Sequence, residues 1–288
     1  MGTLPNGTVD HPEQSPLFHA ENSLRYDRQS LISEYEALFS CRLVVIFDMI
    51  WPISISFFEE LIYDMDKTMD LHIMLMTPGG DGESAVRLAR SAQDRCNELT
   101  VLIPDQAKSA GTILALGAHR ILMGPTSDLG PIDPQLQLAN QTWTSAKDII
   151  AALSAAEAAV QEKPATYPIH AALLADVTAL MVQQARSALA RSNDLMKEAL
   201  ASNPDRTTEE VRDLCKNLQE PLISLPNSHA ALLDKNDAKN LGLPVEIVDP
   251  NGDQWRIAWR LWTKYLVAGL RIYEGSKASK IAGTWNQS

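Results

Sequence analysis

The 288-residue chain lacks the features that mark several large classes of protein. No stretch comes near the roughly 18 consecutive apolar residues that a membrane-spanning helix needs. The first residues have neither the basic start nor the apolar centre of a secretory signal. The three cysteines, Cys41, Cys96 and Cys215, are odd in number and show no metal-ligand spacing, which favours reduced thiols in a core. These absences predict a soluble, cytoplasmic protein without a bound metal.

Basic charge is also scarce, because 25 Lys and Arg stand against 36 Asp and Glu and leave a net charge of -11. Nucleic-acid binding depends on neutralising phosphates with basic side chains, so the composition excludes a general nucleic-acid binder. Residues 250–288 differ, with six basic and two acidic residues and four of the six tryptophans. The helical spacing of Trp255, Trp259, Trp262 and Leu266 favours a packing surface, and contact with a membrane surface is the minor alternative.

Apolar stretches of strand length alternate with amphipathic stretches in the first half of the chain. The pattern predicts buried strands over 43–50, 71–77, 99–105 and 119–125, with helices over 24–38, 57–68, 84–97 and from about 110 to 117. Such alternation is typical of parallel strands joined by right-handed crossovers, so the predicted fold class is α/β. Helices are expected over 146–162, 169–201 and 207–218, then a helix end, a short strand and a helical tail.

Composition divides the chain into three parts. Residues 1–23 are rich in Pro, Gly and polar side chains and are predicted to form a flexible arm. Residues 24–248 are predicted to form one domain that includes the helical segment at about 146–220. Residues 249–288 are the Trp-rich, basic C-terminal extension.

Two turns directly follow predicted strands. The first, TPGGDG (77–82), has three glycines in four positions, which let a backbone approach a ligand closely. It lacks the Lys-Ser/Thr ending of a phosphate-binding loop and the spacing of a dinucleotide fingerprint, so a tight structural turn is the alternative.

The second turn, AKSAGT (107–112), places Ser109 between small residues at the start of a helix. A nucleophilic serine is commonly exposed in this way, while an N-cap is the alternative role. Turns at the carboxyl ends of neighbouring parallel strands lie side by side. Backbone N–H groups of Gly79, Gly80 and Ala110 are therefore candidates for an oxyanion hole beside Ser109.

Together these motifs resemble the superfamily of the Clp proteolytic subunit and the signal peptide peptidases. The finer resemblance, to the serine dehydrogenase proteinases, is carried by SDLGPIDPQ (127–135) and by NSH (227–229) ahead of AKNLGLPV. It covers about residues 25–248. It implies a Clp/crotonase-like superhelix of repeated strand-strand-helix units with a parallel sheet, followed here by C-terminal helical additions. No cofactor is implied, and no nicotinamide fingerprint is present.

The resemblance also implies the catalytic residues, because this group is described with the chain order Ser, Asp, His. Ser109 would be the nucleophile, His229 the general base and Asp133 the residue that orients the imidazole, an arrangement that suits triad chemistry. Asp133 as a turn residue before Pro134 and His229 as a loop residue are the alternatives. A second candidate base is Lys147, because signal peptide peptidases use a Ser–Lys dyad; otherwise Lys147 is a solvated residue at a helix start.

The predicted function is a serine peptidase that cleaves peptides or unfolded proteins through an acyl-enzyme. A crotonase-type enzyme acting on coenzyme A thioesters, or a non-catalytic oligomeric scaffold, would keep the fold without this chemistry. The resemblance also implies a homo-oligomer, with the helices of 146–201 and the surface of the Trp-rich tail as candidate contacts between subunits. A regulatory partner of unknown identity stays open.

Overall fold

The computed structural model describes residues 15–137, 142–224 and 232–284. Its main sheet has seven strands in the order β10-β5-β3-β2-β1-β11-β12. Five run parallel, and β11 and β12 are antiparallel additions at one edge. The strands are β1 (Cys41–Phe47), β2 (Asp70–Met76), β3 (Leu99–Ile103), β5 (Arg120–Met123), β10 (Val245–Ile247), β11 (Leu270–Glu274) and β12 (Ser279–Thr284). The predicted α/β class is confirmed.

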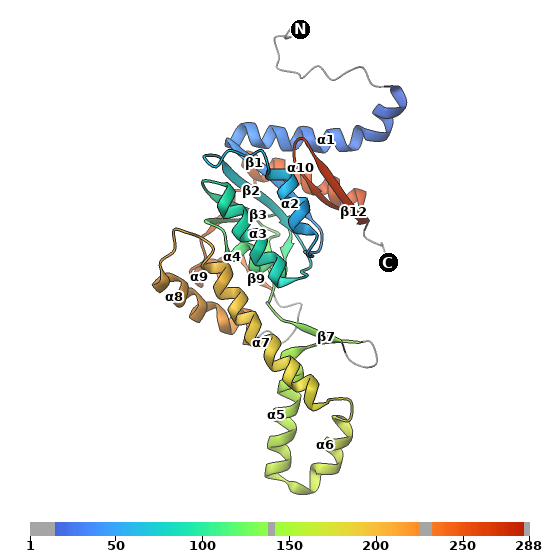
Figure 1. Cartoon of the computed structure of the whole chain (residues 1–288), viewed down its shortest axis with the longest axis vertical. Coiled ribbons are helices and arrows are strands. Elements are labelled where there is room, and N and C mark those ends of the chain that lie inside the picture. The colour runs from blue at the N-terminus through green and yellow to red at the C-terminus, as the bar shows by residue number, and fades with distance from the viewer. Residues whose placement is uncertain (1–14, 138–141, 225–231, 285–288) are drawn as a thin grey trace.

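Different helices cover the two faces of the sheet (Figure 1). One face packs on α2 (Ser54–Ile62), α3 (Gly82–Arg95) and α4 (Ala110–Leu116), and the other on α1 (Pro16–Phe39) and α10 (Asp253–Ala268). In β1, Val44 and Ile46 enter the first core, whereas Val45 and Phe47 enter the second. Because side chains alternate along a strand and both faces are buried, these strands are apolar at nearly every position.

The chain ends differ from the sequence prediction. The first helix begins at Pro16, so residues 16–23 are helical rather than part of a flexible arm, while residues 1–14 lie outside the described part. The C-terminal extension contains α10 and also the hairpin β11–β12, which the sequence pattern did not indicate. The pattern failed because β11 carries Arg271 and Glu274, whose charges are paired only in the folded protein.

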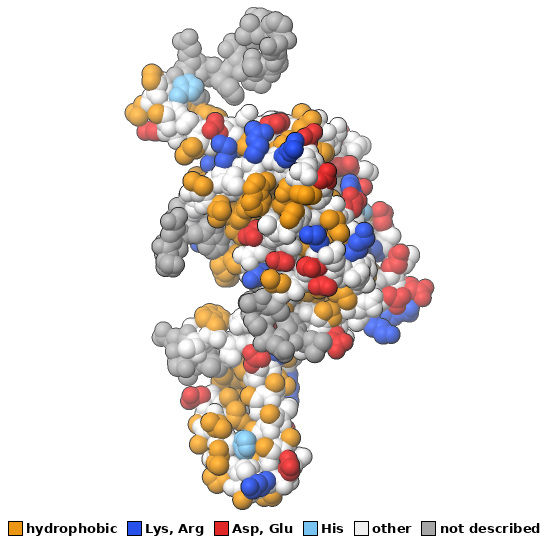
Figure 2. All heavy atoms as spheres, turned by 180° about the vertical axis from the view of Figure 1, so that it is seen from behind, with side chains coloured by type: hydrophobic (Ala, Val, Ile, Leu, Met, Phe, Trp, Pro, Cys, Tyr) orange, Lys and Arg blue, Asp and Glu red, His pale blue; other side chains and the backbone are white. Residues whose placement is uncertain are grey.

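A helical arm projects from the body (Figure 1). It consists of α5 (Ala146–Glu162), a short 3-10 turn (Pro164–Thr166), α6 (Tyr167–Leu173) and the first part of α7 (Ala179–Leu200). The helix predicted over 169–201 is therefore two helices. Large apolar side chains are exposed on the arm, and Figure 2 shows such side chains over much of it: Tyr167, Ile169, Leu173 and Leu180.

The remaining elements complete the body beside the parallel sheet. A small sheet contains β4 (Gln106–Ala107), β6 (Asp128–Leu129) and β9 (Leu233–Asp234), and a separate strand pair consists of β7 (Gln135–Gln137) and β8 (Trp143–Ser145). Two further helices are α8 (Thr208–Gln219), which continues into a π turn at Glu220–Ser224, and α9 (Lys235–Asn240). Among the described helices, none combines the length and hydropathy needed to cross a bilayer.

The tryptophans of α10 form mainly a packing surface, as the helical spacing predicted. Trp255 and Trp262 are buried, and only Trp259 is partly exposed. On the same side of the sheet, the Glu274 carboxylate of β11 is fully buried and accepts hydrogen bonds from Arg28 Nε of α1 at 2.8 Å and from the Tyr265 hydroxyl of α10 at 2.6 Å. We call these three residues the Glu274 cluster. It ties both ends of the chain to the sheet.

A buried histidine joins the same elements. His72 of β2 is 6% exposed, and its Nδ1 shares a hydrogen bond of 2.9 Å with the Tyr35 hydroxyl of α1. Gln254 Nε2 of α10 donates to that hydroxyl at 3.0 Å, which leaves the hydroxyl proton for His72. Burial lowers the pKa of His72 to about 4, repulsion by Arg120 adds to the shift, and attraction by Asp70 opposes it. The imidazole is therefore neutral in the folded protein.

We expect His72 to make the protein less stable as the pH falls from about 6.5 to about 4. In this pH range the His72 imidazole is protonated in the unfolded chain but not in the folded protein. The free energy of unfolding therefore decreases as the pH falls, by about 3 kcal/mol in all. The measurement is the free energy of unfolding in urea at several pH values, for wild type and for His72→Asn, whose Oδ1 can replace Nδ1 as acceptor. Parallel pH curves for the two proteins would contradict the prediction.

Candidate active site

The carboxyl ends of the central parallel strands continue into turns that pair with one another. Beyond β1 and β2, Ile50 forms a parallel bridge with Gly80, and beyond β2 and β3, Thr77 forms one with Ala107. The Ala107 carbonyl oxygen in turn accepts the N–H of Gly130 at 3.0 Å. We call this row of turns the carboxyl edge. The turn that carries Ser109 lies within it.

Ser109 has a backbone conformation that serine rarely adopts, with φ 49 and ψ -108. The Gly111 N–H donates to the Lys108 carbonyl oxygen at 2.8 Å, so Ser109 is the first central residue of a type II′ turn. Glycine is the usual residue there, and another residue costs roughly 1–3 kcal/mol. A strained serine at this position indicates that its side chain is needed.

The hydroxyl of Ser109 is not used as a helix cap. Ser109 directly precedes α4, but its side chain makes no capping hydrogen bond, whereas an N-cap side chain normally accepts an N–H from the next turn. Its backbone carbonyl oxygen accepts the Ile113 N–H at 3.0 Å. The N-cap alternative therefore accounts for the backbone of half-buried Ser109 and not for its hydroxyl.

Pairing with Ile50 sets the direction of the Gly80 N–H. Ile50 donates its N–H to the Gly79 carbonyl oxygen at 2.9 Å and accepts the Asp81 N–H at 2.7 Å. In a parallel bridge of this kind, the N–H and C=O of the opposed residue point away from the partner strand. The Gly80 N–H is thus directed to the other side of its strand, where β3 and the Ser109 turn follow.

Gly79 and Gly80 are both in the left-handed region that favours glycine, with φ +124 and +134. A Cβ on Gly80 would lie 2.1 Å from the Ile50 carbonyl oxygen, and a Cβ on Gly79 would lie 3.1 Å from Ser109 Cβ and 3.7 Å from Ser109 Oγ. The glycines therefore allow the first turn to lie directly against Ser109.

The three N–H groups assigned to the oxyanion hole are not equivalent. The Gly79 N–H donates to Thr77 Oγ1 at 3.1 Å. By contrast, the N–H groups of Gly80 and Ala110 make no hydrogen bond to another described residue, and Ala110 is the first residue of α4, where N–H groups have no intrahelical partner. Gly80 and Ala110 are the available donors, while Gly79 serves close packing.

Asp133 is an interior residue, 2% exposed, and therefore more than a surface turn residue. Its carboxylate accepts hydrogen bonds from Ser145 Oγ at 2.5 Å and Gln135 Nε2 at 2.9 Å. The segment before it is fastened to the Ser109 helix, because Thr112 Oγ1 donates to the Gly130 carbonyl oxygen at 2.7 Å. Asp133 thus follows, three residues later, the Gly130 segment that is bonded to the carboxyl edge.

The two candidate bases stand differently. His229 lies in 225–231, outside the described residues. Lys147, the second residue of α5, has a buried Nζ with no hydrogen-bond partner in the described structure, so the prediction of a solvated lysine is wrong. Its backbone N–H donates to Ser145 Oγ, the same hydroxyl that donates to Asp133. Sequence spacing does not reveal that this amine is buried.

Carboxylates gather behind the Ser109 turn. Burial raises the pKa of Asp105, and the Asp128 carboxylate raises it further; burial and then Asp234 raise the pKa of Asp128. Attraction by the Lys108 ammonium opposes both shifts. The Lys108 stem packs on Gly130, where a Cβ would lie 2.7 Å from Lys108 Cγ. Lys108 is thus a partner of these acids and not simply an exposed lysine.

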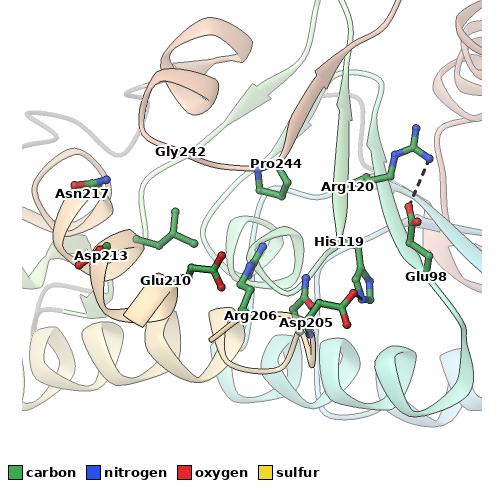
Figure 3. A pocket seen from close by; sticks show the side chains of 12 residues that line it. Glu98, His119, Arg120, Asp205, Arg206, Glu210, Asp213, Asn217, Gly242 and Pro244 are labelled. Atoms are coloured by element: carbon green, nitrogen blue, oxygen red, sulfur yellow. Dashed lines mark hydrogen bonds and ion pairs between the residues drawn. The ribbon is translucent and has the colours of Figure 1, made fainter. Parts of the chain in front are cut away.

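The cavity in Figure 3 lies near the opposite, amino ends of β3 and β5 and has a volume of about 480 Å³. Its charges are largely satisfied within the protein: Arg120 pairs with Glu98 at 3.5 Å, and His119 Nε2 lies 3.5 Å from Asp205. Arg206 donates to the carbonyl oxygens of Leu116, Ala118 and Leu200. His119 Nδ1 also accepts the Leu99 N–H at 2.9 Å, so this histidine is part of the packing at the start of β3.

The described residues contain no group of three or more His, Cys, Asp or Glu side chains arranged to hold a metal ion. All three cysteines are free, and burial raises the pKa of Cys41 and of Cys96 to about 12. Sequence analysis missed Ile50 and Ser145. Ile50 acts through its backbone, so its residue type does not indicate the role. Ser145 lies beside Asp133 because strands β7 and β8 pair, and this pairing is not evident from the sequence.

Comparison with known proteins finds short matches to curated proteins and a loose likeness to solved structures. An uncharacterized protein of Methanocaldococcus jannaschii is 41% identical over 71 residues, 25% of this chain and 24% of its own length. A second uncharacterized protein of that organism is 32% identical over 87 residues, 29% of this chain and 30% of its own length. ClpP1 from Listeria monocytogenes is 16% identical, with 79% of this chain and 98% of that chain covered at a TM-score of 0.40, too low to carry an argument.

A family model gives the assignment, because it matches residues 61–253, more than half of the chain. The match includes the glycine turn, the Ser109 turn, Asp133, the arm and the segment of His229. This chain belongs to the family of ClpP-like SDH-type serine proteinases.

Proposed function

We propose that the protein is a serine peptidase in which Ser109 attacks the carbonyl carbon of a peptide bond. The observation that carries the proposal is the strained type II′ conformation of Ser109, whose hydroxyl does not cap α4 and which lies against the glycine turn. Family membership supports the same reaction class.

The reaction follows from the donors at the carboxyl edge. As Ser109 Oγ bonds to the carbonyl carbon, its proton passes to a base, and the carbonyl oxygen becomes an oxyanion between the N–H groups of Gly80 and Ala110. The first amides of α4 favour negative charge at this point. The base then protonates the departing amine, and water attacks the acyl-enzyme ester to free Ser109.

For the base we propose His229, oriented by Asp133, as the resemblance implied. Asp133 already accepts two hydrogen bonds from described side chains and lies in the interior, as an orienting carboxylate of a triad does. The buried, unpartnered amine of Lys147 favours a second assignment, in which Lys147 takes the proton. One experiment separates the two.

The proposal is tested by labelling purified protein with a fluorophosphonate probe and locating the adduct by peptide mass spectrometry. We expect the adduct on Ser109, and a loss of labelling rate of roughly 100-fold or more in His229→Ala, since a general base commonly contributes 10²–10⁴-fold. Lys147→Met, which keeps the buried volume, is the matched variant and should label normally. The reverse pattern assigns the base to Lys147, and an unlabelled wild type contradicts the peptidase.

Further parts of the proposal concern assembly and surroundings. Exposed apolar side chains on α6 and α7 support self-association through the arm, and peptides or unfolded chains are the proposed substrates. The free cysteines suit a reducing compartment such as the cytoplasm.

A coenzyme A thioester enzyme of crotonase type would not need Ser109, so binding of coenzyme A with survival of activity in Ser109→Ala would favour that alternative.

A further inference from the structure

The two ends of the chain, outside the family match at residues 61–253, meet behind the glycine turn. From the N-terminal side comes the turn 48–54, which follows β1 and contains Ile50. From the C-terminal side comes β11, which pairs antiparallel with β1. Neither segment contributes a reacting group. The turn 48–54 pairs with Gly80 through Ile50, and β11 lies on the other side of β1, one strand further from Gly80.

Side chains of β11 fasten the turn 48–54. The Tyr273 hydroxyl, in a fully buried side chain, shares a 2.7 Å hydrogen bond with Ser54 Oγ and donates to the Met49 carbonyl oxygen at 3.3 Å. Arg271 Nε donates to Asp48 Oδ1 at 2.6 Å, and the Asp48 side chain is 3% exposed.

The turn is also closed on itself. Asp48 Oδ1 accepts the Met49 N–H at 2.7 Å, and Ser54 Oγ accepts the Trp51 N–H at 2.9 Å. Ile50, between these two anchored points, therefore has little freedom to move away from Gly80. Its carbonyl oxygen and N–H hold the residues on both sides of Gly80, as described above.

We propose that Tyr273 is a positioning residue for the oxyanion donor of Gly80, acting through Ser54, Met49 and Ile50. The inference rests on the proposed peptidase function. An oxyanion donor stabilises a transition state only when it is held at a fixed place, and loss of a donor costs 10²–10³-fold in rate. If the turn 48–54 is loosened, the Gly80 N–H is displaced but still present. The expected decrease in rate is therefore smaller than the decrease caused by loss of the donor.

The test compares Tyr273→Phe with Tyr265→Phe. Both remove a buried tyrosine hydroxyl from the C-terminal extension, but the Tyr265 hydroxyl bonds Glu274 and does not touch the turn. We expect Tyr273→Phe to lower the limiting rate of fluorophosphonate acylation about 5- to 20-fold, with the half-saturating probe concentration and the pH profile unchanged. Tyr265→Phe should stay within about twofold of wild type even if its melting temperature falls further.

A second readout needs no activity. Hydrogen exchange of the Ile50 and Asp81 amides, whose bonds form the bridge to the glycine turn, should accelerate in Tyr273→Phe and in Ser54→Ala but not in Tyr265→Phe. An unlabelled wild type would defeat the peptidase proposal, and the exchange data would still decide whether β11 holds the turn. Unchanged exchange, or faster exchange with an unchanged acylation rate, overturns the role of Tyr273.

Discussion

Ser109→Ala is expected to reduce peptide hydrolysis by at least about 10³-fold, because removal of a serine nucleophile leaves only the binding and oxyanion contributions to the rate. The fold should be unaffected, since the Ser109 hydroxyl makes no capping bond and alanine keeps the same backbone strain. The measurement is the initial rate of cleavage of unfolded casein and of a fluorogenic peptide mixture.

The controls for this result use the same chain. Ser56, an exposed serine of α2, should tolerate alanine without loss of rate. Ser109→Gly should be as inactive as Ser109→Ala but no less stable, because glycine accepts φ 49 without strain. Full hydrolysis by Ser109→Ala would remove Ser109 from the mechanism.

Arg28→Ala is expected to destabilise the protein by about 3–5 kcal/mol, the largest stability effect we foresee. Without the guanidinium, the fully buried Glu274 loses both hydrogen bonds from Arg28 and keeps only the Tyr265 hydroxyl as a described partner. The measurement is the free energy of unfolding in urea at pH 7. The double variant Arg28→Met/Glu274→Leu should recover at least half of the loss, since two apolar side chains leave no buried charge.

A matched surface pair serves as the control. Arg260 of α10 lies 3.4 Å from Glu34 of α1, and the two side chains are 59% and 45% exposed. Arg260→Ala should cost less than about 1 kcal/mol, because solvent screens an exposed pair. Equal decreases in the free energy of unfolding for Arg28→Ala and Arg260→Ala would contradict the prediction that burial makes the Arg28–Glu274 pair the more important of the two for stability.

Local sequence pattern predicted the parallel strands and the Ser109 turn well because each signal is contained in a few neighbouring residues. A doubly buried strand must be apolar throughout, and the turn AKSAGT follows directly on such a strand, where a serine is either an N-cap or an exposed nucleophile. The same reasoning missed β11, since its Arg271 and Glu274 look like surface residues until their partners, more than 200 positions away, are known.

Lys147 shows why the candidate site was harder to predict than the fold. From the sequence it is a charged residue in the first turn of a helix, where solvent is the usual environment. Its amine is buried in the fold, in which α5 packs against α7, and no spacing rule contains that information. The orientation of the Gly80 N–H was equally hard to predict, because it depends on the backbone of Ile50 and not on any side chain.

The helix α7 gives the arm a mechanical connection to the carboxyl edge. Its 22 residues form one unbroken rod of about 33 Å, which packs on α5 in the arm and on α3 and α4 in the body. Leu195 of α7 touches the start of α3, where a Cβ on Gly82 would lie 2.9 Å from Leu195 Cδ1, and α4 starts directly after Ser109. One continuous helix thus connects the exposed arm to the helices that begin at both turns.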